Sequence, residues 1–484
     1  MLPGSYRAAG LVDDAALVRA LLDVEVAWAR VLGTSVSLGS WVPSLDPVEV
    51  EAAGNPVLPL VSALRARVSG PVHTGLTSQD VLDTALMLLA RAVFSQVSAD
   101  LSRVAAALGS LAAEHRSSVM AGRTLTQFAV PITFGLKAAR WLVGVLDSLD
   151  ELSVVSAGLP VQCGGAAGTL SRAASLVDPQ AGASAFAGFL GLVWPGLPWH
   201  TYRAPVTRVG DALVRVCDAL GVMAADVLTL GRPEIGEVSE GAVAGRGGSS
   251  TMPHKRNPVL SVLVNSAGLQ APQLGAQLHL CAARAVDERP DGAWHAEWPA
   301  LRALMELAVV AASQAAELVE GLEVHADVMA RRAASAAGEL LAERGGADPA
   351  GGELQAPRGG GADPAGGELQ APRGGGADPA GGELQAPRGG GADPAGGDLP
   401  TEHGGGADPV RGEQSVERGD AADAAGGQLL APRGGGADPA TYLGAAEAFV
   451  DAVLARNRSR LEPLRGEHEV PIPIVSEGSD RNGD

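Results

Sequence analysis

A loop near the middle of the chain gathers side chains suited to acid–base chemistry on an anion. It runs from Gly248 to Pro258 and contains two adjacent hydroxyls, a cation and an amide donor, at Ser249, Ser250, Lys255 and Asn257. Glycines before it leave the backbone free to move, and the apolar run 259–264 after it predicts a buried helix that begins near Pro258. A mobile loop anchored to a rigid helix suits a site that closes over an anionic substrate.

An earlier segment, 73–84, offers a second place for a carboxylate. The hydroxyls of Thr77 and Ser78 stand just ahead of a helix expected near Asp80, and donors at a helix N-terminus bind anions. The same residues could also form a capping box for that helix. Both interpretations place the start of a helix at this point in the chain.

Long helices must position these segments. The clearest one spans 209–230, where apolar residues alternate steps of four and three as in the seam of a helix bundle: Val209, Leu213, Val216, Leu220, Met223, Val227 and Leu230. Another helix begins behind Asp13, a suitable N-cap. Strand-like alternation is scarce, so we expect an all-α fold, and we assign these stripes to core packing rather than to a cofactor.

Composition excludes several classes of function. The chain has 55 Asp and Glu against 36 Lys and Arg, which argues against a nucleic-acid partner because such partners need basic faces. The three cysteines are far apart and have no metal-ligand spacing, so we expect reduced thiols in a cytoplasmic protein and no metal or other cofactor. The first ten residues lack the basic patch and apolar run of a signal peptide, and no uninterrupted apolar segment looks long enough for a bilayer, so we expect neither a signal peptide nor a membrane partner.

Residues 344–437 change the character of the chain. A fifteen-residue unit rich in Gly and Pro is seen whole at Gly359–Arg373 and Gly374–Arg388, each time with a single Leu. Such a unit cannot bury enough apolar surface to offset its ordering entropy. We therefore predict a disordered repeat insertion, followed by a helix from about Ala440 to Arg456 and a loose tail over 467–484.

Three separated motifs resemble those of the fumarase/aspartase superfamily: the segment around Thr77, the segment Gly122–Gln127, and the loop at Ser249, which resembles the signature GSSxMPxKxN. Further segments resemble bacterial 3-carboxy-cis,cis-muconate cycloisomerases, namely 158–169, Pro198–Arg203 and Gly292–Trp298. The resemblance covers about residues 4–335 and resumes at Asp438. The repeat stands where the family has a helical segment.

The resemblance implies an architecture and a mode of assembly. It implies a helical bundle with long central helices, in a homotetramer whose active sites each draw motifs from three subunits. We expect an N-terminal helical domain over 1–100, a central bundle over 101–335, and a remnant C-terminal domain formed by 336–343 and 438–466. The implied substrate is a small tricarboxylate that closes to 4-carboxymuconolactone in protocatechuate breakdown.

One departure from the superfamily pattern bears on the chemistry. Lyases of the superfamily usually carry a histidine in the second motif that helps to protonate a leaving amine, whereas this chain has Leu125 there. A cycloisomerase does not need that acid, because in the lactone-opening direction its leaving group is a carboxylate with a pKa near ~4. The remaining alternatives are an adenylosuccinate- or argininosuccinate-type lyase, which Leu125 disfavours, and a non-catalytic relative, which the intact Ser249 loop disfavours.

Roles follow from position in the motifs. We expect Ser249 to be the acid/base, with Ser250 as the alternative, and Lys255 and Asn257 to hold the carboxylate whose α-carbon becomes carbanionic. The resemblance makes further residues candidates for substrate binding: Thr77, Ser78, Thr124, Gln127, Arg203 and Arg289. Arg289 could instead form an interhelical ion pair, and we expect His200 and His295 to be structural.

Overall fold

The computed structural model describes residues 2–252, 254–341 and 438–466. The predicted repeat insertion and the predicted loose tail lie outside these residues. The described residues belong to one compact unit. Its helices are α1 (Asp14–Val31), α2 (Pro47–Ala53), α3 (Val57–Arg67), α4 (Ser78–Glu114), α5 (Phe134–Ala157), α6 (Ser171–Ala174), α7 (Pro179–Leu190), α8 (Ala204–Leu230), α9 (Val259–Ala282), α10 (Gly292–Glu320), α11 (Ala326–Ser335), α12 (Ala337–Leu340) and α14 (Ala446–Gly466), with short 3-10 turns η1 (Ser5–Ala8) and η2 (Pro439–Thr441).

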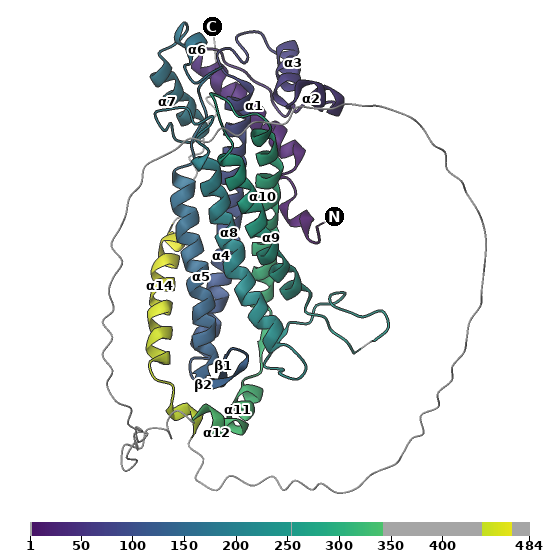
Figure 1. Ribbon diagram of the computed structural model, residues 1–484, viewed down its shortest axis with the longest axis vertical. Coiled ribbons are helices and arrows are strands. Elements are labelled where there is room, and N and C mark those ends of the chain that lie inside the picture. Colours follow the sequence, from purple (N-terminus) through teal and green to yellow (C-terminus); the bar gives the residue numbers. More distant parts are fainter. Residues whose placement is uncertain (1, 253, 342–437, 467–484) are drawn as a thin grey trace, which may run out of the picture. The chain divides into compact units, whose positions relative to one another are not determined.

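Long helices α4, α5, α8, α9 and α10 pack side by side, as Figure 1 shows. The predicted seam of α8 is confirmed, since all seven of its apolar residues are buried. Asp13 is confirmed as the N-cap of α1, where its carboxylate accepts from the amide of Ala16 at 2.8 Å. The all-α expectation therefore holds for the described residues, apart from two small antiparallel ribbons.

Helix α4 is the longest of the described helices. It has 37 residues, so its two ends are about 55 Å apart. The predicted domain boundary at residue 100 falls inside it. By length and mean hydropathy α4 could cross a membrane, which the sequence interpretation missed, but 67% of its most apolar window is buried. Burial of that kind is also found in the core helix of a soluble bundle.

The two ribbons lie at one end of the bundle. Strand β1 (Val119–Thr124) pairs with β2 (Gln127–Thr133), and β3 (Val238–Glu240) pairs with β4 (Leu322–Val324). Sequence reasoning did not predict the first hairpin. Helices α1, α3, α6 and α7 lie at the opposite end, near the start of α4.

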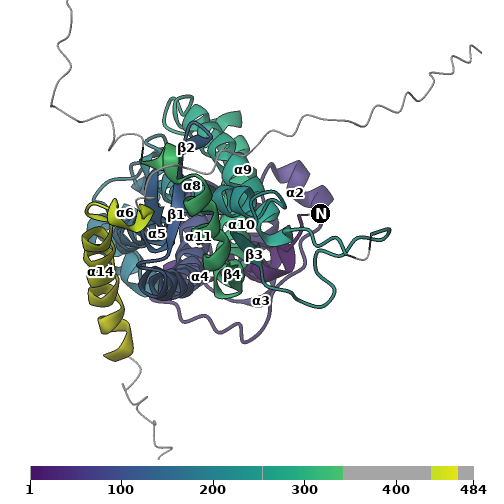
Figure 2. The same ribbon diagram turned by 90° about the horizontal axis from the view of Figure 1, so that it is seen from below.

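The final helix differs from its predicted bounds. It begins at Ala446 rather than Ala440 and runs to Gly466, because the chain first forms η2 and then turns at Gly444, whose φ is +53°. Helix α14 packs on α5 and α4, as Figure 2 shows in the view from below. Arg456 reaches Asp147 and Asp150 on α5, each at 2.7 Å.

The described residues on either side of the repeat emerge close to each other. Asp438 and Pro439 line one small cavity together with Ala330, Ala333 and Ala334 of α11, and the chain leaves this region through α12 only a few residues later. An insertion between neighbouring points need not separate the elements that flank it, and lengthening a loop costs only about 0.6 kcal/mol per doubling.

We therefore expect deletion of Gly359–Arg433 to leave activity and oligomeric state nearly unchanged. Size-exclusion chromatography with light scattering and a steady-state assay would compare the deleted and full-length proteins. Limited proteolysis of the full-length protein should cut inside the repeat and leave the remainder assembled. Dissociation of the oligomer on deletion would show that the repeat is structural.

Candidate active site

The first motif forms the start of α4. Thr77 is the N-cap, and the carboxylate of Asp80 accepts from its amide at 2.9 Å, which confirms the capping interpretation. Thr77 and Ser78 are 8% and 9% exposed. Their hydroxyls therefore sit at the positive end of the helix dipole, where a carboxylate is favoured.

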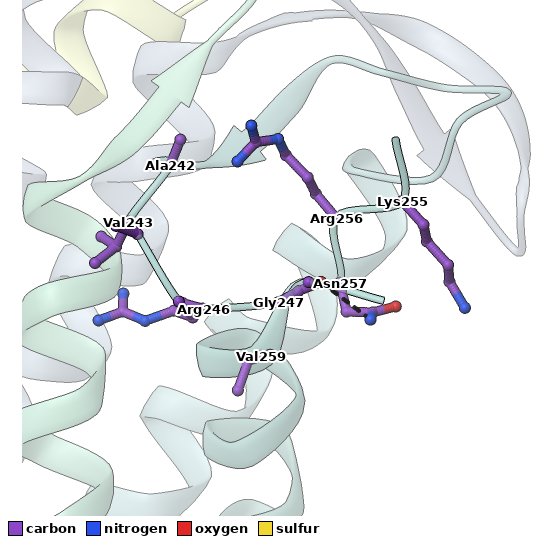
Figure 3. A pocket seen from close by; sticks show the side chains of 11 residues that line it. Ala242, Val243, Arg246, Gly247, Lys255, Arg256, Asn257 and Val259 are labelled. Carbon is purple, nitrogen blue, oxygen red and sulfur yellow. Dashed lines mark hydrogen bonds between the residues drawn. The ribbon is translucent and has the colours of Figure 1, made fainter. Parts of the chain in front are cut away.

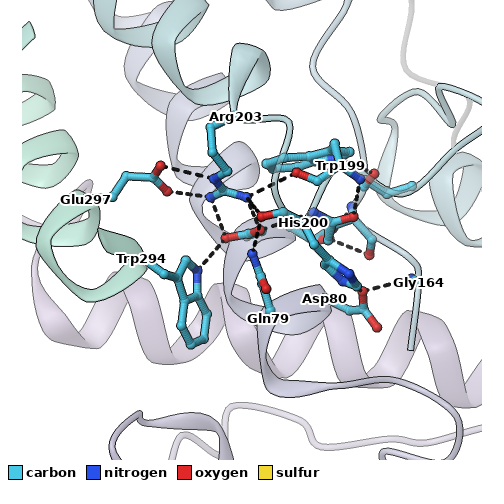
Figure 4. A network of polar contacts seen from close by, with 12 residues as sticks. Gln79, Asp80, Gly164, Trp199, His200, Arg203, Trp294 and Glu297 are labelled. Atoms are coloured by element: carbon cyan, nitrogen blue, oxygen red, sulfur yellow. Dashed lines mark hydrogen bonds and ion pairs between the residues drawn. The ribbon is translucent and has the colours of Figure 1, made fainter. Parts of the chain in front are cut away.

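Asp80 joins this helix start to two distant segments. Its carboxylate accepts from the amides of Gly164 and Gly165, at 2.9 and 2.8 Å, and lies 2.8 Å from Nε2 of His200 (Figure 4). Asp80 is fully buried and His200 is 4% exposed. The expectation that His200 is structural agrees with this placement, since the ring helps to hold the end of α4.

Arg203 lies in a closed ion network beside Asp80. Its guanidinium donates to Asp83 at 2.6 and 3.0 Å, and to both carboxylate oxygens of Glu297 (Figure 4). Burial disfavours its charge, but these two carboxylates outweigh burial and raise the pKa of Arg203. For Glu297 the two effects have the opposite signs: burial raises the pKa of this carboxyl, and the nearby charge of Arg203 lowers it by less. Because Arg203 is 2% exposed and donates to these carboxylates, the geometry favours a positioning role over its predicted contact with substrate.

The second motif forms the tip of the β1–β2 hairpin. Thr124 pairs with Gln127 across a two-residue turn made of Leu125 and Thr126, whose φ values are +48° and +72°. Positive φ at both central residues is typical of the tightest hairpins but is costly for residues other than glycine. Leu125 is 96% exposed. The tip thus presents Gln127 beside an apolar side chain that has no acid–base capacity.

The third motif is the exposed loop between β3 and α9. The hydroxyl of Ser249 accepts from the amide of Met252 at 3.1 Å, and the side-chain amide of Asn257 donates to the carbonyl of Gly247 at 3.1 Å. Ser250 and Lys255 are exposed, and Ser249 is half-buried. The loop is tied at its far end by Glu240, which accepts from the amide of Ser261 at 2.6 Å in the first turn of α9.

A hollow of about 600 Å³ opens inside this loop. Three cationic residues, Arg246, Lys255 and Arg256, line it together with Asn257, and its lining holds no carboxylate. Figure 3 shows Arg246 and Lys255 pointing away from one another. Arg246 pairs with Glu317, whereas Lys255 and Arg256 have no ion pair among the described residues. In an acidic protein, such a basic hollow favours an anionic ligand.

The predicted site residues fall into two groups at opposite ends of the bundle. Thr77 and Ser78 lie at the start of α4, and exposed Arg289 lies at that same end, because Trp294 just after it donates to Asp83 at 2.9 Å. The hairpin tip lies past the other end of α4. The Ser249 loop is also there, since Arg123 on β1 bonds Glu237 just before β3, at 2.9 and 3.0 Å.

Comparison with known proteins identifies the family of the chain. A family model described as lyase matches residues 47–272. The chain is 45% identical to a nitrosuccinate lyase from Streptomyces davaonensis, over 69% of this chain and 76% of that protein. It is 39% identical to a 3-carboxy-cis,cis-muconate cycloisomerase from Pseudomonas aeruginosa, over 70% and 75% of the two chains.

The chain belongs to the fumarase/aspartase superfamily.

Among solved structures, the 3-carboxy-cis,cis-muconate lactonizing enzyme from Pseudomonas putida matches with a TM-score of 0.63 and 34% identity, over 70% of this chain and 80% of that one. The superfamily resemblance drawn from the three motifs is therefore confirmed. The individual roles of Ser249, Lys255, Asn257 and the other candidate residues stay predictions.

Several residues around the site escaped sequence reasoning. Asp80 and Asp83 were noted only as parts of a motif, although their spacing of three on a helix places both on one face. Arg256 adjoins Lys255 in the loop and could have been found as a second cation. The link from Arg246 to Glu317 spans 71 residues, and no local signal reveals it.

The three cysteines carry no chemistry at this site. Cys163, Cys217 and Cys281 are free and buried, as expected for reduced thiols. Burial raises the pKa of Cys217 to about 12 and also raises those of the other two. Each thiol therefore stays protonated near neutral pH and is a poor nucleophile.

We expect Arg203→Leu to reduce the free energy of unfolding by about 3–5 kcal/mol, because it leaves the carboxylates of Asp83 and Glu297 buried without their partner. Denaturant unfolding monitored by circular dichroism would measure the loss. Arg331→Ala is the matched control, since it removes an exposed ion pair with Asp327 and should change little. Equal losses in the two variants would contradict the assigned importance of the buried network.

Proposed function

We propose that this superfamily member is a cycloisomerase that interconverts 3-carboxy-cis,cis-muconate and 4-carboxymuconolactone through a carbanion. The observation that carries the proposal is the pairing of a basic hollow at the Ser249 loop with an apolar residue, Leu125, in the second motif. The first feature suits a polyanionic substrate, and the second suits a leaving group that needs no acid.

The closing reaction needs one proton and no added reagent. A carboxylate oxygen of the substrate attacks the conjugated double bond and forms the lactone C–O bond, which leaves a carbanion next to another carboxylate. Ser249 then donates a proton to that carbon, and the reverse reaction returns it. Lys255 and Asn257 stabilise the charge that spreads into the neighbouring carboxylate as an enediolate.

Leu125 is consistent with this scheme because lactone opening releases a carboxylate. Such a group departs as a stable anion, since its conjugate acid has a pKa near ~4. An amine or hydroxide would need a proton donor, and a leucine cannot supply one. The exposed Leu125 therefore fits reactions whose leaving group is already a weak base.

The 45% identity to nitrosuccinate lyase makes nitrosuccinate the second candidate substrate. Removal of a proton beside one carboxylate, followed by loss of nitrite, would give an unsaturated dicarboxylate. Nitrite is also a weak base and departs without an acid, so the same residues serve. The two candidates share the carbanion step and differ in the bond that breaks.

The separation of the motifs supports assembly from several copies. Thr77 and Ser78 lie about 55 Å along α4 from the hairpin that carries Gln127, so one copy cannot bring both to one small substrate. We propose a homotetramer in which the ends of different subunits meet. No cofactor enters this scheme.

Parallel assays of the purified full-length protein test the reaction. Loss of the diene's ultraviolet absorbance with 3-carboxy-cis,cis-muconate is the expected result, and colorimetric release of nitrite from nitrosuccinate tests the second candidate. If only nitrosuccinate is turned over, the proposed substrate is nitrosuccinate and not 3-carboxy-cis,cis-muconate. Turnover of neither would overturn the proposal.

Ser249→Ala should lower kcat by a factor of ~100 or more and leave the melting temperature unchanged, because it removes the acid/base. Ser250→Ala is the matched control, one residue away in the same loop, and should have the smaller effect. A larger loss in the Ser250 variant would reverse the assignment of the two hydroxyls.

Leu125→His should not raise turnover of either candidate, since neither leaving group needs a proton. Steady-state kinetics would compare it with Leu125→Gln, which is polar but cannot act as an acid. Both side chains would be exposed at the hairpin tip, so the fold should tolerate each. A clear gain in turnover in the histidine variant, absent from the glutamine variant, would contradict the argument that the leaving group needs no acid.

A further inference from the structure

An apolar hollow of about 580 Å³ lies where α5 ends and α8 begins. Helix α5 contributes Val154 to its wall, and the segment before α8 contributes Leu197, Trp199 and Tyr202. Val154, Leu197 and Tyr202 are 75%, 73% and 70% exposed. Single apolar residues on a surface are ordinary, but several large ones around one hollow mark a place where another apolar segment binds.

The wall of this hollow combines prolines with aromatic rings. Its prolines are Pro160, Pro195, Pro198 and Pro205. The rings are those of Trp199 and Tyr202. Grooves with aromatic walls bind proline-rich segments in an extended conformation, so the hollow suits an extended apolar peptide.

The chain beyond α14 carries a peptide of this kind. Residues 467–484 lie outside the described residues, and their sequence consists of polar residues and glycine except for the run Val-Pro-Ile-Pro-Ile-Val at 470–475. A proline fixes its own φ, and the residue before it favours an extended backbone. The sequence of the run therefore favours the conformation that the hollow accepts, which lowers the entropic cost of docking.

Helix α14 approaches the hollow along α5, beside which it lies in Figure 1. Asp451 near its start pairs with Arg116, which precedes α5 in the chain, at 2.7 Å. Further along, Arg456 and Arg460 both pair with Asp150 of α5. The contacts of α14 thus move toward the C-terminal end of α5, and the two helices run in the same direction.

The end of α14 is level with the part of α5 that lines the hollow. Helix α14 continues for six residues beyond Arg460, a rise of about 9 Å. Val154 lies four residues beyond Asp150 on α5, about 6 Å further along. The three residues that follow α14 span up to about 10 Å, so the run 470–475 of the same chain begins within reach of the hollow.

Charge favours one direction for the run. Arg208 is the charged residue in the lining of the hollow, and it is exposed and has no ion pair among the described residues. Glu477 follows the run by two residues. A run that enters beside α5 and crosses toward α8 brings this carboxylate to the guanidinium of Arg208. Such an exposed pair adds little affinity but favours the correct orientation.

We propose that the run 470–475 docks in the hollow between α5 and α8 of its own chain. Docking covers the exposed side chains of Val154 and Leu197. It also joins the C-terminal helix to the segment before α8, which carries His200 and Arg203 and holds the start of α4. The inference is independent of the reaction proposed above, and it limits the predicted loose tail to the residues outside the run.

A disulfide trap in the full-length protein tests the placement. Leu197→Cys combined with Ile474→Cys should cross-link under mild oxidation within one chain, so that non-reducing electrophoresis shows a monomer and mass spectrometry shows the two peptides joined. Leu269→Cys combined with Ile474→Cys is the matched control, because Leu269 is 68% exposed and lies outside the hollow. The native cysteines are free and buried, so the oxidation reports on the introduced pair.

Hydrogen exchange measured by mass spectrometry tests the docking without an engineered bond. Ile472→Asp combined with Ile474→Asp should speed the exchange of the amides at 195–203 by about tenfold, because charged side chains disfavour docking in an apolar hollow. Ser479→Asp combined with Asn482→Asp adds the same two charges beyond the run and should leave the exchange unchanged. None of these positions belongs to the described core, so both variants should fold.

A cross-link within one chain, together with faster exchange in the isoleucine variant, supports the docking. A cross-link between two chains would assign the hollow to the tail of a neighbouring copy and would overturn the placement within one chain. A cross-link no stronger than in the Leu269 control, or unchanged exchange in the isoleucine variant, would overturn the docking itself.

Discussion

One guanidinium joins three long helices at the end of the bundle where α4 begins. Arg203 at the start of α8 bonds Asp83 on α4 and Glu297 on α10, and all three side chains are almost completely buried. Trp294 donates to the same carboxylate of Asp83. A buried charge without its partner is strongly destabilising, so these helices must meet in one arrangement. The placement of Thr77 and Ser78 at the tip of α4 depends on it.

Much of the scaffold could be predicted because it follows from local patterns. The seam of α8, the cap at Asp13 and the start of α4 are each encoded by residues close in sequence. The β1–β2 hairpin could not be predicted in this way. Its turn is Leu125-Thr126, whereas sequence signals for such turns rely on glycine and asparagine. The late start of α14 likewise depends on Gly444 and η2, within a stretch whose composition suits a helix.

Only part of the candidate site could be predicted from the sequence. The Ser249 loop was singled out from its side chains alone, and Lys255 and Asn257 of this loop line a basic hollow, whereas Ser249 and Ser250 are not part of its lining. Arg203 was grouped with the substrate-binding residues because it lies in a segment that resembles the cycloisomerases, yet its partners Asp83 and Glu297 lie 120 and 94 residues away. Contacts at such separation leave no periodic trace in the chain.

The backbone at the tip of the hairpin conflicts with the residues that it carries. Among residues other than glycine, asparagine, aspartate and histidine enter the left-handed region most readily, and leucine is not one of them. Leu125 is moreover almost fully in water, so no contact within the described residues offsets its conformational cost. The chain by itself is therefore locally frustrated at this point. In the proposed oligomer, burial of the leucine side chain by a neighbouring copy would offset this conformational cost, and the stability of the hairpin would then depend on assembly.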